Sequence, residues 1–230
     1  MRAIVRPAAV ITGEMANQPV RSNTEPRWPA SLAVLAAIVL YATLPDRYTM
    51  GPTWLIPALE AALLIGLNLT APRRRPEEAL LLRAAAIALT GLVTVTNFFA
   101  LGLLIDSLLH GSKAEGTQLI FAAIQIWLTN VAVFALWFWE LDRGGPGQRR
   151  QTSSLPDFLF PQMSAKEIAA RDWTPNFVDY LYVSFTNAMA FSPTDTMPLT
   201  RWAKLLMLAQ SLASLLTVSF LAARAVNILS

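Results

Sequence analysis

The chain has 230 residues, of which 54% are hydrophobic and 14% charged, and its formal net charge is +3; the mean hydropathy is +0.45. A soluble globular chain carries about 25% charged residues, so this composition excludes a soluble enzyme and a disordered protein. The absence of cysteine excludes a disulfide scaffold and a cysteine metal site. We expect an all-α, polytopic transmembrane helical bundle. Arginines at cytoplasmic helix ends explain the positive charge better than nucleic-acid binding does.

The N-terminal half divides into a polar tail and a four-span bundle. Residues 1–27 mix charged residues with Pro, Asn, Ser and Thr, which predicts a polar cytoplasmic tail. Residues 28–141 contain four apolar runs that are long enough to cross a bilayer. These predicted spans are Trp28–Leu44, Trp54–Thr70, Ala79–Ile105 and Thr117–Leu141.

Residues 142–176 form the longest polar stretch within the chain, and we expect a cytoplasmic loop with a short interfacial helix there. Arg143–Gly147 reads Arg-Gly-Gly-Pro-Gly without a following Gly-Lys-Ser/Thr, so we interpret it as a linker and not as a phosphate-binding loop. Ser164-Ala-Lys-Glu167 fits a capping box, which predicts a short helix that runs to Arg171.

The C-terminal segment, residues 177–230, is expected to form a channel-like helical hairpin from two apolar pieces, Phe177–Phe191 and Trp202–Leu229. If both pieces cross the membrane, the protein has six spans with both termini in the cytoplasm. Fourteen of the eighteen basic residues then lie on the cytoplasmic side and four lie outside, which agrees with the positive-inside rule.

A dip of 177–191 into the membrane is the alternative to a full crossing. A dip from outside puts three basic residues inside and fifteen outside, which violates the positive-inside rule, whereas a dip from the cytoplasm gives fifteen inside and three outside. Charge therefore does not separate the cytoplasmic dip from six spans. We expect six spans because Trp173–Phe191 supplies nineteen mostly apolar residues.

Polar side chains recur at helical spacing in four spans, and we call each such row a polar seam. The seams are Arg83, Thr90, Thr94 and Asn97; Gln118, Gln125, Thr129 and Glu140; Tyr180, Ser184 and Asn187; and Gln210, Ser214, Thr217 and Arg224. They either line a hydrated path or hydrogen-bond between helices, and the sequence leaves both readings open. Near the span ends, snorkelling accounts for Arg83, Glu140 and Arg224. Glu60, in the second span, is the best candidate for a functional ionisable group, with a protonated packing residue as the alternative.

Residues 184–200, Ser-Phe-Thr-Asn-Ala-Met-Ala-Phe-Ser-Pro-Thr-Asp-Thr-Met-Pro-Leu-Thr, resemble the pore signature of two-helix potassium channels, and the likeness extends over about residues 177–226. It implies a pore helix, a filter and an inner helix. The filter-like residues implied by the resemblance are Thr186, Asn187, Phe191, Ser192, Pro193, Thr194 and Asp195. Ser192 and Thr194 stand where that family has glycine, and Pro193 lacks an amide donor, so we do not expect a potassium-selective filter of the familiar kind.

The same segment is also similar to an uncharacterised family of bacterial inner-membrane proteins with a Ser-Phe-Thr…Asp…Thr-Arg pattern. That likeness implies no activity. It is compatible with an outer turn over Ser192–Thr200, in which Asp195 and Pro198 have ordinary turn roles.

Two functions follow as hypotheses. The first is a channel-like or transport protein for ions or small solutes in the bacterial inner membrane. Its expected partners are the lipid bilayer, monovalent ions and further copies of the chain. The second is a non-conducting membrane scaffold or sensor. The sequence has no His-Glu-x-x-His or Gly-x-Ser-x-Gly motif, so we expect no enzyme, no catalytic residues, no metal and no cofactor.

Overall fold

A computed structural model describes residues 25, 27–52, 54–70, 76–110, 116–149, 154–165, 167, 173–189 and 195–229. Its α-helices are α1 (Trp28–Ala42), α2 (Leu55–Thr70), α3 (Pro76–Leu109), α4 (Gly116–Leu141), α5 (Pro161–Ser164), α6 (Phe177–Ala188) and α7 (Arg201–Leu229). Two 3-10 turns, η1 (Asp46–Tyr48) and η2 (Asp142–Gly144), and two short strands, β1 (Phe158–Leu159) and β2 (Met197–Pro198), complete it. The all-α prediction is confirmed.

Among the described residues, three helices are long and apolar enough to cross a membrane, namely α3, α4 and α7. α1 and α2 are apolar but shorter, with 15 and 16 residues. Their bounds lie close to the predicted first two spans, because Pro45 ends the first apolar run, and Pro57 falls in the first turn of α2, where a helix tolerates proline. The predicted helix from Ser164 to Arg171 lies mostly outside the described residues.

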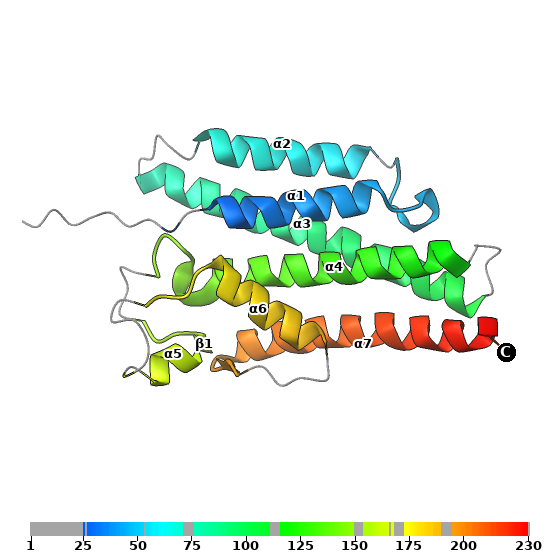
Figure 1. Ribbon diagram of the computed structural model, residues 1–230. Coiled ribbons are helices and arrows are strands. Elements are labelled where there is room, and N and C mark those ends of the chain that lie inside the picture. The colour runs from blue at the N-terminus through cyan, green and yellow to red at the C-terminus, as the bar shows by residue number, and fades with distance from the viewer. Residues whose placement is uncertain are drawn as a thin grey trace, which may run out of the picture.

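α4 is the central helix of the bundle, and α7 lies at its edge (Figure 1). In the apolar part of α4, 67% of the residues are buried, against 28% in the corresponding part of α7. The buried core joins Phe134 and Phe138 of α4 to Val34 of α1, Leu89 of α3 and Tyr180 of α6. α1, α3, α6 and α7 therefore pack directly on α4, whereas α2 packs on α1 and α3.

α4 and α7 are antiparallel neighbours. In the middle of α4, Asn130 Nδ2 donates to Ser214 Oγ at 3.0 Å and to Gln210 O at 3.3 Å. Beyond the end of α4, β1 pairs antiparallel with β2, so that Phe158 lies opposite Pro198, just before α7 begins. α4 therefore ends where α7 begins, and we call this the entry end of the bundle.

α6 begins at the entry end and stops part of the way along α7 (Figure 1). It has twelve residues, or about 18 Å at 1.5 Å per residue, which is well short of the roughly 30 Å of a hydrocarbon core. Because β2 brings the chain back to the entry end, the described residues do not show Phe177–Phe191 crossing the whole bundle, and the prediction of six spans is not confirmed. The alternative, in which the segment enters and leaves at one end, agrees with the fold.

Candidate functional site

The start of α6 is fixed by its own sequence. Asn176 Oδ1 accepts a hydrogen bond from Val178 N at 2.9 Å, and Asp179 Oδ2 accepts one from Asn176 N at 2.8 Å. These two bonds form a capping box, which satisfies amide donors that the first turn of a helix otherwise leaves free. α6 therefore begins sharply at Phe177, at the entry end.

A buried ionic cluster holds this first turn against the end of α4. Tyr180 Oη donates to Asp142 Oδ2 at 2.5 Å. Arg149 forms ion pairs with Asp142 at 3.4 Å and with Glu25 at 2.9 Å, and its guanidinium lies 4.7 Å from the centre of the Tyr180 ring. Asp142 and Tyr180 are fully buried and Arg149 is 3% exposed. We call Glu25, Asp142, Arg149 and Tyr180 the Arg149 cluster.

The turn after α4 makes this cluster possible. Gly144 and Gly145 have φ angles of +82° and +89°, which glycine adopts readily. A Cβ on Gly145 would lie 2.8 Å from the Glu140 carbonyl oxygen. The predicted linker Arg143–Gly147 is therefore an ordered turn, which returns the chain so that Arg149 can enter the core. The expected snorkelling of Glu140 is also wrong, because that residue is only 3% exposed.

Asp157 connects the same region to the start of α7. Its backbone N–H donates to Asp142 Oδ1 at 2.8 Å, and its Oδ1 accepts from Trp202 Nε1 at 3.0 Å. Leu199 N donates to the Asp157 carbonyl at 2.8 Å. The end of α4, the start of α6 and the start of α7 are thus held together at the entry end.

A second set of bonds, which we call the mid-bundle network, fastens the last turns of α6. Ser184 Oγ donates to Val131 O of α4 at 2.7 Å. Gln210 Nε2 of α7 donates to Ser184 Oγ at 2.6 Å and to Ser184 O at 2.9 Å. Asn187 Nδ2 donates to Gln210 Oε1 at 2.8 Å and to Met207 O at 2.9 Å. With the Asn130 bonds, the network joins α4, α6 and α7.

The structure brings together only part of the predicted polar seams. Ser184, Asn187, Gln210 and Ser214 meet in the mid-bundle network, together with Asn130, which the seam pattern missed. Asn130 is 2% exposed and lies one residue from Thr129 in the fourth-span seam. The sequence feature that could have identified Asn130 is its amide side chain within an apolar run, because a polar side chain in a membrane span is energetically unfavourable unless it has a partner.

The remaining seam residues bond elsewhere. Gln125 Nε2 donates to Thr43 Oγ1, just after α1, at 2.8 Å. Thr217 Oγ1 donates to Ala213 O of its own helix at 2.8 Å. Asn97 is buried on α3 at 4% exposure.

The predicted filter residues are only partly described. Thr186 Oγ1 donates to Tyr182 O of its own helix at 2.9 Å, and Asp195 is exposed. Phe191, Ser192, Pro193 and Thr194 lie outside the described residues.

Glu60 is isolated from the rest of the site. It is fully buried on α2, and neither of its carboxylate oxygens has a hydrogen-bond partner among the described residues. Within the described part of the chain, no group of three or more His, Asp or Glu residues could hold a metal ion.

Two physical properties of the site follow. The polar side chains of the mid-bundle network bond to one another and to backbone carbonyls, so they fix α6 against α4 and α7. The carboxyl end of α6 lies part of the way along α7 (Figure 1), and a helix C-terminus carries about half a negative charge.

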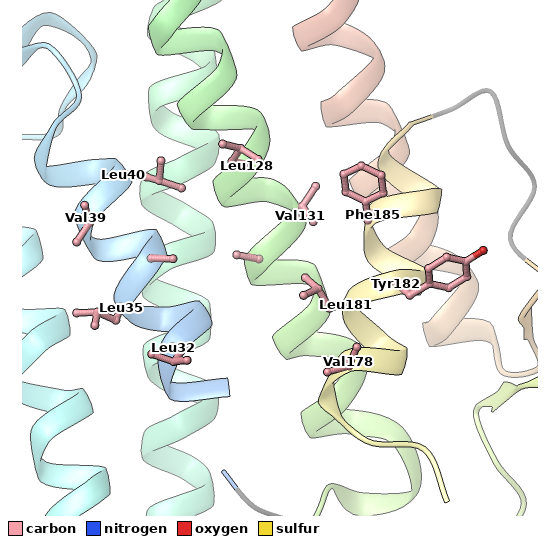
Figure 2. A pocket seen from close by; sticks show the side chains of 12 residues that line it. Leu32, Leu35, Val39, Leu40, Leu128, Val131, Val178, Leu181, Tyr182 and Phe185 are labelled. Atoms are coloured by element: carbon pink, nitrogen blue, oxygen red, sulfur yellow. The ribbon is translucent and has the colours of Figure 1, made fainter. Parts of the chain in front are cut away.

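An apolar groove of about 850 Å³ lies beside α6 on the outer surface (Figure 2). α1 and α6 form its two walls and α4 forms its floor. Leu35 and Val39 line one wall, Val178 and Phe185 line the other, and Val131 lies between them.

Comparison with known proteins gives no relative: no family model, no curated protein and no solved structure matches this chain.

Proposed function

We propose that the protein is a pore-loop membrane protein that forms a homo-oligomeric channel for small cations. The observation that carries this proposal is the half-length helix α6, which starts at the entry end, is fastened by the mid-bundle network and ends part of the way along α7 (Figure 1). Half-helices with this orientation place partial negative charge at membrane depth, where transport proteins bind cations. The potassium-channel resemblance of residues 184–200 supports the same reading.

The proposed topology has five crossings and one dip. The segments at the entry end hold fifteen of the eighteen basic residues, and the opposite end holds Arg47, Lys113 and Arg224. The positive-inside rule then places the entry end and the N-terminal tail in the cytoplasm and the end of α7 outside. α1 and α2, at about 22–24 Å, cross with local thinning of the bilayer.

The proposed path runs beside the residues that follow α6. In the sequence, Thr186 and Asn187 come before and Asp195 comes after the filter-like residues of the resemblance, which are Phe191, Ser192, Pro193 and Thr194. Because serine, threonine and proline replace the family's glycine and tyrosine, the channel selects cations by charge more than by potassium-specific coordination. The bacterial inner membrane remains the proposed location.

Flux into liposomes tests this proposal. Full-length protein reconstituted in phospholipid vesicles should pass potassium and sodium faster than chloride, and flux no greater than in empty vesicles would overturn it. Asn187→Leu removes three side-chain bonds that hold the end of α6, with Met207 O, Gln210 Oε1 and Ser211 Oγ. At about 0.6 kcal/mol per bond they are worth about 1.8 kcal/mol together, and their loss should lower flux at least tenfold. Gln118→Leu, an exposed change at the far end of α4, is the matched control.

A non-conducting scaffold is the second candidate, because the mid-bundle network uses its polar groups for packing. This reading predicts that the protein passes no ions and that it binds a partner through residues 142–176. Pull-down of membrane partners with and without residues 165–171 separates it from the channel.

A further inference from the structure

α7 presents an apolar ridge at the edge of the bundle. Leu205, Leu208, Leu212 and Leu215 are spaced three, four and three residues apart, so they follow one line along the helix, as in a coiled-coil seam. They are between 51% and 65% exposed. We call these four residues the α7 ridge.

The α7 ridge and the apolar groove lie at the same level along the bundle. The Asn130 bonds to Gln210 and Ser214 set α4 level with the middle of the ridge. The Gln125–Thr43 bond sets α1 against α4, and counting back along both antiparallel helices puts Leu35 of the groove level with Leu208 of the ridge.

We propose that the α7 ridge of one copy packs into the α1–α4–α6 groove of a second copy. Copies in one membrane are related by rotation about the membrane normal, which keeps every residue at its own depth, so a ridge and a groove can meet only if their levels agree. Because the two surfaces differ, the contact is head-to-tail, and repeating it closes a ring. This inference rests on the proposed homo-oligomer and names its interface.

Charge at the entry end supports the same pairing. Lys204 is exposed beside the ridge, one turn before Leu208. Asp179 is half-buried beside the groove, three residues before Tyr182 on α6, and residues three apart are neighbours on a helix surface. The contact therefore brings Lys204 of one copy towards Asp179 of the next copy near the entry end. Lipid tails are as apolar as this contact, so leaving them for the contact gains no hydrophobic free energy. Shape and charge complementarity therefore determine whether the two copies associate.

Cysteine cross-linking tests the interface directly, because the natural chain has no cysteine. Full-length Leu35→Cys and Leu208→Cys chains carrying different tags are co-expressed, and membranes are oxidised with copper phenanthroline. The mixed pair should give a dimer that carries both tags, and neither variant alone should. The control pair Leu35→Cys and Val226→Cys uses an exposed α7 position about 27 Å along the helix from Leu208, and should give none.

The other outcomes overturn the interface. A dimer from Leu208→Cys alone means a symmetric α7–α7 contact, a dimer from the control pair means a different register, and no dimer in any pair means that lipid covers the groove. Lys204→Glu should lower the mixed-pair yield at least threefold, whereas Arg47→Glu, at the far end, should leave it unchanged. Flux is measured on the same membranes: cross-linking without flux rejects the channel alone, and flux without cross-linking rejects this interface alone.

Discussion

Replacing Arg149 by methionine is the sharpest test of how the entry end is held. The guanidinium pairs with Glu25 and Asp142 and donates to the carbonyls of Trp139 and Pro175. Because Arg149 is only 3% exposed, water cannot replace these partners. Methionine fills similar space but leaves two buried carboxylates without this partner. Removing one member of a buried pair costs about 3–5 kcal/mol, and we expect Arg149→Met to lower the free energy of unfolding by that amount.

The assay is SDS-induced unfolding in mixed micelles, followed by tryptophan fluorescence. Trp139 is a reporter within the site, because its Nε1 donates to Glu25 Oε1 at 2.6 Å. Arg201→Met, an exposed change at the start of α7, should stay within about 0.5 kcal/mol of the natural chain. The double variant Arg149→Met with Asp142→Asn should cost less than the sum of the single changes. A loss below about 1 kcal/mol for Arg149→Met, or strict additivity, would refute the buried cluster.

Three further substitutions probe the other features, each by the same unfolding assay. Gly145→Ala should lose about 2–3 kcal/mol, because alanine is strained at φ +89° and its Cβ meets a carbonyl; Gly147→Ala, with open space around it, should be near neutral, and equal losses would contradict this. Gln210→Leu removes three bonds of the mid-bundle network and should cost about 2 kcal/mol; an unchanged stability would show that the network is not holding α6. Glu60→Gln should leave stability within about 0.5 kcal/mol, since Glu60 has no ion-pair partner to lose among the described residues; a loss above 2 kcal/mol would show a hidden cationic partner.

Helix positions were predictable where the sequence carries local signals. The predicted second and fourth spans end at Thr70 and Leu141, as α2 and α4 do, because apolar length and polar boundaries define such helices. The direction of α6 was not predictable. Nineteen apolar residues suit either a crossing or a dip, and the deciding contact, β1 with β2, joins residues about forty positions apart.

The candidate site was predictable only in part, for a similar reason. Ser184, Asn187, Gln210 and Ser214 stood out by helical spacing, and they do meet. The Arg149 cluster did not stand out, because Asp142 and Arg149 lie in a polar stretch whose composition is typical of an exposed loop. Their burial depends on the positive φ angles of Gly144 and Gly145 and on Tyr180 arriving from another helix, and spacing alone encodes neither.

Sided block of flux through a Thr194→Cys channel tests the central claim most directly. The chain has no other cysteine, so a membrane-impermeant thiol reagent can react only at this position. With the N-terminal tag used to determine orientation in the vesicles, the pore-loop account predicts that cation flux is lost when the reagent reaches the side of the N-terminal tail, and is unchanged when it reaches the other side. Block from the opposite side, or flux unaffected by reagent on either side, would contradict a path that runs beside a loop entered from the entry end.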